Sequence, residues 1–109
     1  MTDPTIQWVR VDVSDLRDEQ TRAARVGGLD VLLCRVSDHI HAVENRCSHA
    51  ATELADGRLR GNLLECPLHG AEFDVRTGNP TRPPARRPIT TFPVRCESGQ
   101  YEVGIPSDG

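Results

Sequence analysis

The chain has 109 residues, of which 16 are acidic and 13 are basic, all of them arginine, and its formal net charge is −3. This length is typical of one domain with a small apolar core, so we expect residues 1–109 to form a single domain. The arginines are spread among the acidic residues, and aromatic side chains make up only 4 % of the chain. Such a composition argues against a nucleic-acid binder, which needs a basic stripe and stacking aromatics.

No segment of the sequence indicates a membrane span or a secretory leader. The apolar stretches are only a few residues long, and residues 1–10 lack the basic-then-apolar order of a signal peptide. We therefore expect a soluble, cytoplasmic protein that does not bind membranes. Its four cysteines would then be reduced thiols or metal ligands rather than disulfides.

Short runs of β-branched residues separated by turn residues predict an all-β fold. Ser37-Asp38 separates two of these runs, which therefore read as a hairpin. Helix is expected only in short pieces, near residues 15–24 and 51–55. In chain order the expected strands are 6–13, 31–36, 40–43, 63–66, 71–75, 90–97 and 100–105.

Residues 78–93 are rich in proline. Because proline has no amide donor, this segment cannot form a central strand, and we expect a stiff loop. Its prolines are Pro80, Pro83, Pro84, Pro88 and Pro93.

Two short segments each combine one cysteine with one histidine: Cys47-Ser48-His49 and Cys66-Pro67-Leu68-His69. A binuclear iron cluster with two cysteines on one iron and two histidines on the other needs loops that each offer both ligand types. Zinc also accepts two cysteines and two histidines. Zinc fingers, however, usually group the two cysteines before the two histidines, whereas here the residues alternate.

The segments 45–49 and 66–70 resemble the two cluster-binding loops of Rieske proteins, and the similarity to the Rieske-type ferredoxins of bacterial multicomponent dioxygenases extends over nearly the whole chain. It implies a Rieske-type all-β fold of stacked antiparallel sheets, with both loops at one tip. Pro83-Pro84-Ala85 would match the proline-rich loop that covers the cluster. The implied ligands of one [2Fe–2S] cluster are Cys47, His49, Cys66 and His69.

The sequence also departs from other Rieske proteins. Respiratory and photosynthetic members carry an extra, disulfide-forming cysteine in each loop, and these positions are Thr52 and Leu68 here. Their serine and tyrosine hydroxyls, which donate to cluster sulfurs, correspond to Ala71 and Phe73. Since such hydrogen bonds stabilise the added electron, we expect a potential toward the low end of the Rieske range, about −150 mV.

The resemblance implies a non-enzymatic one-electron carrier for the catabolism of aromatic hydrocarbons. It would pass electrons from a flavin-dependent NAD(P)H reductase to a terminal ring-hydroxylating oxygenase, docking briefly at the cluster tip. The alternative is a small Rieske subunit of a larger reductase, such as NAD(P)H nitrite reductase. An oxygenase is excluded, because the chain lacks the length for a catalytic domain and a further histidine and carboxylate cluster for mononuclear iron.

Four other residues carry possible metal or sulfur chemistry. His39 and His41 would share a face of a strand, but no third ligand is close in sequence. Cys34 and Cys96 lie in expected strands, and we expect both to be small core residues. A disulfide between them is the alternative.

Overall fold

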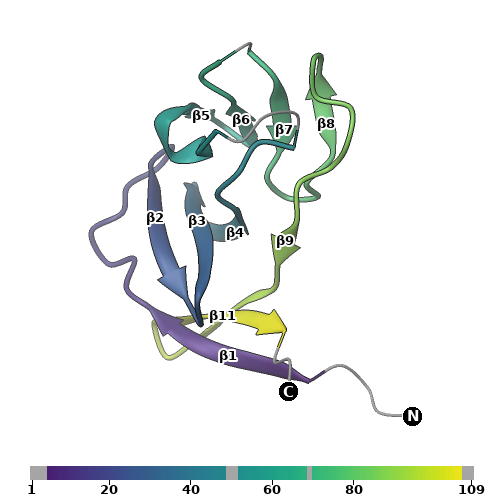
Figure 1. Ribbon diagram of the computed structural model, residues 1–109. Helices are drawn as coiled ribbons and strands as arrows, with labels where there is room; N and C mark the ends of the chain where they lie inside the picture. The colour runs from purple at the N-terminus through teal and green to yellow at the C-terminus, as the bar shows by residue number, and fades with distance from the viewer. Residues whose placement is uncertain (1–4, 49–51, 69, 107–109) are drawn as a thin grey trace.

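Three antiparallel sheets build the computed structural model, which describes residues 5–48, 52–68 and 70–106 (Figure 1). Every strand pairing within these sheets is antiparallel, which confirms the all-β prediction. In chain order the elements are β1 (Ile6–Val11), β2 (Thr21–Val26), β3 (Leu29–Val36), β4 (His39–Glu44), the 3₁₀ turn η1 (Leu54–Asp56), β5 (Arg58–Arg60), β6 (Leu63–Glu65), β7 (Glu72–Asp74), β8 (Pro80–Arg82), β9 (Thr91–Phe92), β10 (Val94–Glu97) and β11 (Gln100–Pro106).

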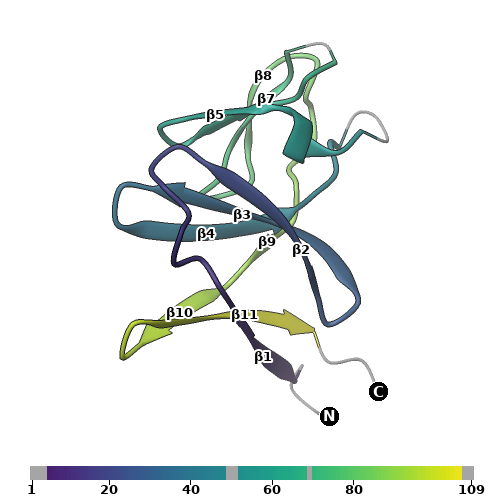
Figure 2. The same cartoon turned by 90° about the vertical axis from the view of Figure 1, so that its left-hand side faces the viewer.

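The sheets are stacked as layers, which Figure 2 shows edge-on. The strand order is β1-β11-β10 in the first sheet, β2-β3-β4-β9 in the second and β5-β6-β7-β8 in the third. The second sheet lies between the other two, so the third sheet and the first occupy opposite ends of the molecule (Figures 1 and 2).

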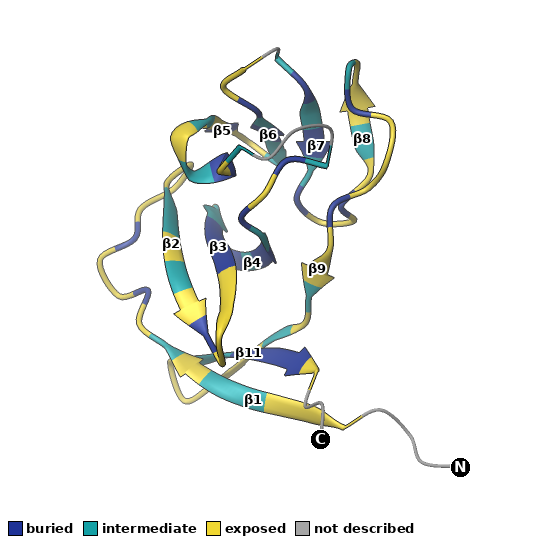
Figure 3. Cartoon of the chain, in the orientation of Figure 1, coloured by how far each residue is buried: buried dark blue, intermediate teal, exposed yellow. Residues whose placement is uncertain are grey.

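Residues 31–34 of β3 are buried on both faces because the strand belongs to the middle layer (Figure 3). Its side chains alternate between two apolar cores, as the period of an extended chain requires. Leu32 and Cys34 pack into the core shared with the third sheet, whereas Val31 and Leu33 pack into the core shared with the first sheet.

Most strands lie where the sequence predicts them. The predicted hairpin is confirmed as β3 and β4, joined by a turn in which Ser37 has a φ of 56°. The opening strand ends at Val11, two residues earlier than expected. The expected strand 90–97 is split into β9 and β10 at Pro93, since proline cannot donate to a ladder.

Two expectations from the sequence are wrong. No helix forms at 15–24, because residues 21–26 form β2 and pair in register with β3 from Thr21↔Cys34 to Val26↔Leu29. The alanines and arginines of this segment favour helix weakly, and cross-strand pairing overrides that preference. The proline-rich segment is not wholly a loop either. It contributes β8 and β9, each at the edge of its sheet, where proline is tolerated.

Across the residues that the structure describes, no helix is long and apolar enough to cross a membrane.

Candidate cluster-binding site

Two loops of the same construction carry Cys47 and Cys66. In each loop the cysteine N–H donates to the carbonyl oxygen five residues further on, Cys47 to Thr52 at 2.9 Å and Cys66 to Ala71 at 2.6 Å. Both cysteines are almost fully buried, with 2 % and 1 % of their surface exposed. The two thiols thus occupy equivalent positions in their loops, as a site requires in which each loop lends one cysteine to the same iron.

The cysteines of both loops belong to one apolar core, together with Leu64, Ala71 and Phe73. Thiolate ligands in such surroundings are shielded from water, which helps to control the redox potential of a bound cluster. His49 and His69, the predicted imidazole ligands, lie outside the described residues. The donor set and burial of the described part therefore fit a Rieske cluster.

The predicted covering loop reaches the same core. Ala85 is 7 % exposed and packs in the cluster of side chains that contains Cys47 and Cys66. The loop is fastened to the first cysteine loop by Ser48, whose Oγ donates to the carbonyl oxygen of Arg87 at 2.7 Å. The Arg87 guanidinium reaches back to the carbonyl oxygen of Ser48 at 3.5 Å.

Gly70 supports the turn of the second loop. Its φ of +74° lies in the left-handed region, where a residue without Cβ is favoured.

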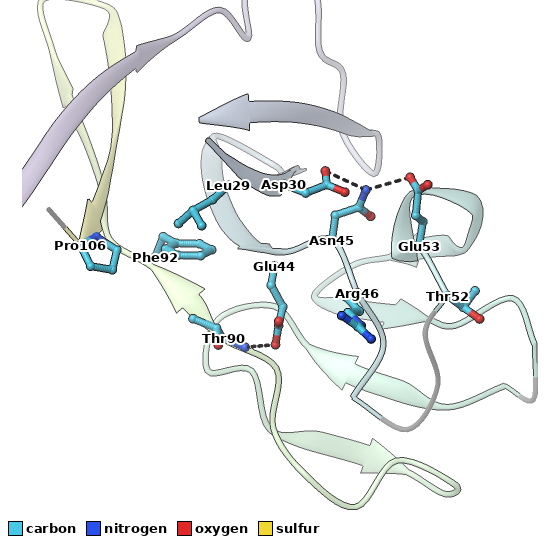
Figure 4. A pocket seen from close by; sticks show the side chains of 10 residues that line it. All are labelled: Leu29, Asp30, Glu44, Asn45, Arg46, Thr52, Glu53, Thr90, Phe92 and Pro106. Carbon is cyan, nitrogen blue, oxygen red and sulfur yellow. Dashed lines mark hydrogen bonds between the residues drawn. The ribbon is translucent and has the colours of Figure 1, made fainter. Parts of the chain in front are cut away.

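Asn45 anchors the base of the first loop (Figure 4). Among the described residues it is the one polar residue that is buried, with 3 % of its surface exposed. Every polar atom of its side chain takes part in a hydrogen bond. Its amide nitrogen donates to Asp30 Oδ1 at 3.2 Å and to Glu53 Oε1 at 3.1 Å, while its oxygen accepts the Ala55 N–H at 2.8 Å. The side chain thereby joins β3, the first cysteine loop and η1.

Replacing Asn45 by alanine removes these three hydrogen bonds. Because the Ala55 N–H then loses its acceptor in a partly buried position, we expect a loss of about 1–3 kcal/mol in the free energy of unfolding. The loop that starts two residues later would be less well held, so the variant should also lose its iron faster on heating. Denaturant unfolding and the decay of visible absorbance measure the two effects. Asn79→Ala is the control, since the Asn79 side chain is exposed and makes no hydrogen bond with any described residue; equal losses in both variants would contradict the anchoring role.

Cys34 and Cys96 are free thiols in different environments, so no disulfide joins them. Cys34 is fully buried in β3, and burial raises the pKa of its thiol to about 12. Cys96 is exposed on β10.

These environments predict different reactivities in the folded protein. With a pKa of about 12, only about one Cys34 thiol in ten thousand is ionised at pH 8, so it should not react with a thiol reagent such as DTNB. Cys96 should react within minutes. In an anaerobic titration with the visible absorbance monitored, Cys96→Ser should abolish the fast reaction and Cys34→Ser should preserve it. The reverse pattern would refute this assignment.

His39 and His41 lie on one face of β4, as predicted, with ring centroids 6.4 Å apart. Partial burial and the neighbouring His39 lower the pKa of His41. Within the described part of the chain, no group of three or more histidine, cysteine or carboxylate side chains is arranged to hold a metal ion. The pair is thus a surface feature of β4 and gains no third ligand there.

Two residues of this chain stand where respiratory and photosynthetic Rieske proteins have a serine and a tyrosine, and both pack in the core of the second cysteine. Ala71 and Phe73 are both fully buried in the core with Cys66. Neither side chain carries a hydrogen-bond donor. The expectation of a low potential is therefore unchanged.

Sequence reasoning did not find the roles of Asn45 and Ser48. In the sequence, Asn45 stands out only as the first residue of the segment 45–49. Its uncharged amide between Glu44 and Arg46 is a weak signal of a buried anchor. No local signal links Ser48 to Arg87, since the two are 39 residues apart.

The chain belongs to the Rieske [2Fe-2S] domain family, whose model matches residues 7–93. It is 35 % identical over 107 residues to the anthranilate 1,2-dioxygenase ferredoxin subunit of Burkholderia cepacia, covering 96 % of this chain and 99 % of the relative. The solved ferredoxin of carbazole 1,9a-dioxygenase from Nocardioides aromaticivorans IC177 has a TM-score of 0.84 at 35 % identity, covering 88 % of this chain and 95 % of that one. One chain in a complex of reduced oxygenase and oxidized ferredoxin in carbazole 1,9a-dioxygenase has a TM-score of 0.82 at 36 % identity. The match covers 88 % of this chain and 91 % of that one.

These relatives are ferredoxin components and not catalytic oxygenases. The protein is accordingly an electron carrier with one Rieske-type [2Fe–2S] cluster. The zinc site that the ligand types left open is excluded by this family membership.

Proposed function

We propose that Cys47, His49, Cys66 and His69 are the four cluster ligands. The observation that carries this proposal is the pair of matching loops, each starting at a buried cysteine of the same core and each including one of the two histidines. When bound, the cluster accepts and releases one electron. The side chains around the two cysteines exclude water from the sulfur ligands, and the loop that contains Ala85 covers them.

The test is the electron paramagnetic resonance spectrum of the dithionite-reduced protein, together with its iron and sulfide content. We expect two irons and two acid-labile sulfides per chain and the low average g value of a cluster with mixed cysteine and histidine ligands. A colourless protein with one zinc and no acid-labile sulfide would refute the proposal.

We further propose that the electron acceptor is the terminal oxygenase of a ring-hydroxylating system and that the donor is a flavin-dependent NAD(P)H reductase. Support for the acceptor comes from the relatives, which are components of dioxygenase systems, and from the structural neighbour in complex with its oxygenase. The same relatives favour this role over a subunit of nitrite reductase. The site of action would be the cytoplasm, which separation of cell fractions tests.

The proposed unit is one domain, because β3 contributes side chains to both apolar cores and so couples all three sheets. A single cooperative unfolding transition is the expected result.

We expect docking at the cluster tip, where Leu68 has 54 % of its surface exposed beside the second cysteine. Leu68→Asp should slow electron transfer to an oxygenase without loss of the cluster, since an aspartate cannot be desolvated as cheaply as leucine in an apolar contact. The anthranilate 1,2-dioxygenase of Burkholderia cepacia is a suitable acceptor for stopped-flow measurements. Ile6→Asp is the matched control, because Ile6 is 47 % exposed on β1, at the other end of the molecule (Figure 1). Equal transfer rates in wild type and Leu68→Asp would contradict this prediction.

A further inference from the structure

One segment of this chain carries arginines without any acidic residue among them. Residues 75–96 contain five arginines and no acidic residue. The other eight arginines share the rest of the chain with all 16 acidic residues. The segment that includes the covering loop is thus strongly basic in a protein whose net charge is negative.

Three arginines of the segment are neutralised by ion pairs: Arg76 with Asp74 at 2.9 Å, Arg82 with Glu65 at 3.5 Å and Arg95 with Glu102 at 2.7 Å. Arg86 and Arg87 have no such partner among the described residues, nor does Arg46 from the first cysteine loop. All three are exposed.

These three arginines line two clefts beside the first cysteine loop. Arg46 and Arg87 line one cleft of about 410 Å³ together with Cys47 and Ser48. Arg86 and Arg87 line a second, of about 230 Å³, together with Ser48 and Pro84. Ser48 and Arg87 are common to both clefts, and their hydrogen bonds hold the covering loop against the cysteine loop. These bonds hold the backbone that carries Arg87 against the first cysteine loop, so the arginines of both clefts lie on one flank of the proposed redox site.

We propose that Arg46, Arg86 and Arg87 form a basic docking surface that binds the carboxylates of an acidic redox partner. The inference rests on the proposed function and adds to it the charge that the partner presents. The planar fork of a guanidinium matches a carboxylate with two parallel hydrogen bonds.

The charges near the cluster tip decide how a partner approaches, because salt screens the charges that lie farther away on the molecule. At an ionic strength of 0.1 M the Debye length is about 10 Å, so charges on the opposite sheet are largely screened at the cluster tip. Three carboxylates line a pocket together with Arg46, and all three are already engaged within the fold. Glu44, which also lines the cleft of Arg46 and Arg87, accepts the N–H of Thr90 at 2.8 Å, and Asp30 and Glu53 accept hydrogen bonds from the amide of Asn45. Their charges reduce the positive field, but they leave the guanidinium donors available to a partner.

The test uses small oxidants of opposite charge. The reduced protein gives one electron to hexacyanoferrate(III), an anion, or to tris(phenanthroline)cobalt(III), a cation, and stopped-flow absorbance measures both rates. The ratio of the two rates cancels any change in midpoint potential. We expect the rate with the anion to fall at least about threefold as the ionic strength rises from 0.02 to 0.5 M, although the net charge alone predicts an increase.

Charge reversal identifies the residues. In the triple variant R46E/R86E/R87E the rate ratio of anion to cation at low ionic strength should fall about tenfold or more. The matched variant R10E/R17E/R25E has the same net charge, but its changes lie on β1, on the segment that follows it and on β2, and should have a much smaller effect. Poly-L-glutamate, as a surrogate acidic partner, should inhibit the reaction of the wild type with the anion and not that of R46E/R86E/R87E.

Equal effects of the two triple variants, or a rate with the anion that rises with ionic strength, would overturn the basic surface while the electron-carrier function stood. A protein with no reducible cluster would overturn the proposed function, and this inference with it.

Discussion

Cys66→Ser is expected to yield a protein that binds neither iron nor acid-labile sulfide, and Cys47→Ser is expected to do the same. A serine hydroxyl does not supply the thiolate that holds an iron of the cluster. The other two thiols of the chain belong to neither loop: Cys34 is buried in β3, in the same core, and Cys96 is exposed on β10. The measurement is iron and sulfide per chain after anaerobic reconstitution.

The chain provides its own matched controls for this prediction, since it contains four cysteines and four histidines. Cys96→Ser changes an exposed thiol on β10 and should retain the cluster. His49→Ala and His69→Ala should lose it, whereas His39→Ala and His41→Ala, on β4, should retain it. Retention in His69→Ala, or loss in His39→Ala, would refute the ligand set, because each result assigns the imidazole to a different element.

Gly78→Ala is expected to destabilise the protein by about 4 kcal/mol, a large effect for one methyl group. Gly78 has a φ of +81°, and a Cβ at this position would lie 2.2 Å from the carbonyl oxygen of Ile89. The two residues also bond directly, the Ile89 N–H donating to the Gly78 carbonyl at 2.9 Å. A methyl group must therefore push apart the two ends of the segment that carries the covering loop.

Gly99→Ala separates the clash from the backbone strain. Gly99 has a similar φ of +76°, but nothing lies within 4 Å of its would-be Cβ. This control should cost only about 1–2 kcal/mol, the ordinary penalty of the left-handed region. Chemical unfolding curves measure both values, and equal losses would show that the contact with Ile89 carries no energy.

The displacement of Ile89 would also affect the redox site. Ile89 is 3 % exposed and belongs to the same core as Cys47 and Cys66. The covering loop from residue 83 to residue 88 leads directly into it. We therefore expect Gly78→Ala to lose its cluster on heating earlier than Gly99→Ala does, as the decay of visible absorbance would record.

The proposed ligand set would place the cluster against a well-packed part of the fold. Cys47 and Cys66 are buried in the core that β3 and the third sheet share, so a cluster that they held would be supported by that core. The loops that carry them lie at the end of the molecule away from β1 and β11 (Figure 1). The proposed docking residues belong to these loops or adjoin them: Leu68 lies in the second cysteine loop, Arg46 precedes Cys47, and Arg86 and Arg87 lie in the covering loop.

Much of this protein is determined by its sequence. The alternation of apolar and polar residues specifies β1, β4 and β11, because each of these strands has a face that must be buried, whereas the continuous apolar run 31–34 specifies β3, which is buried on both faces there. The pairing of a cysteine with a histidine in each of two segments predicts the cluster, because ligand chemistry is a property of the residues themselves. The restriction of the proline-rich segment to sheet edges likewise follows from the missing amide donors.

Only the tertiary structure decides the rest. Residues 21–26 become β2 because β3 offers an unpaired edge, and no local preference in that segment reveals it. The amide of Asn45 and the hydroxyl of Ser48 act on partners brought close by the packing of distant segments. Whether an arginine is neutralised or left to a partner depends on the same packing, since Arg82 lies beside Glu65 across the third sheet, whereas Arg86 lines a cleft with Ser48. Local preferences fix most of the strands, but contacts between remote residues are set by register and turn geometry, which exist only once the chain has folded.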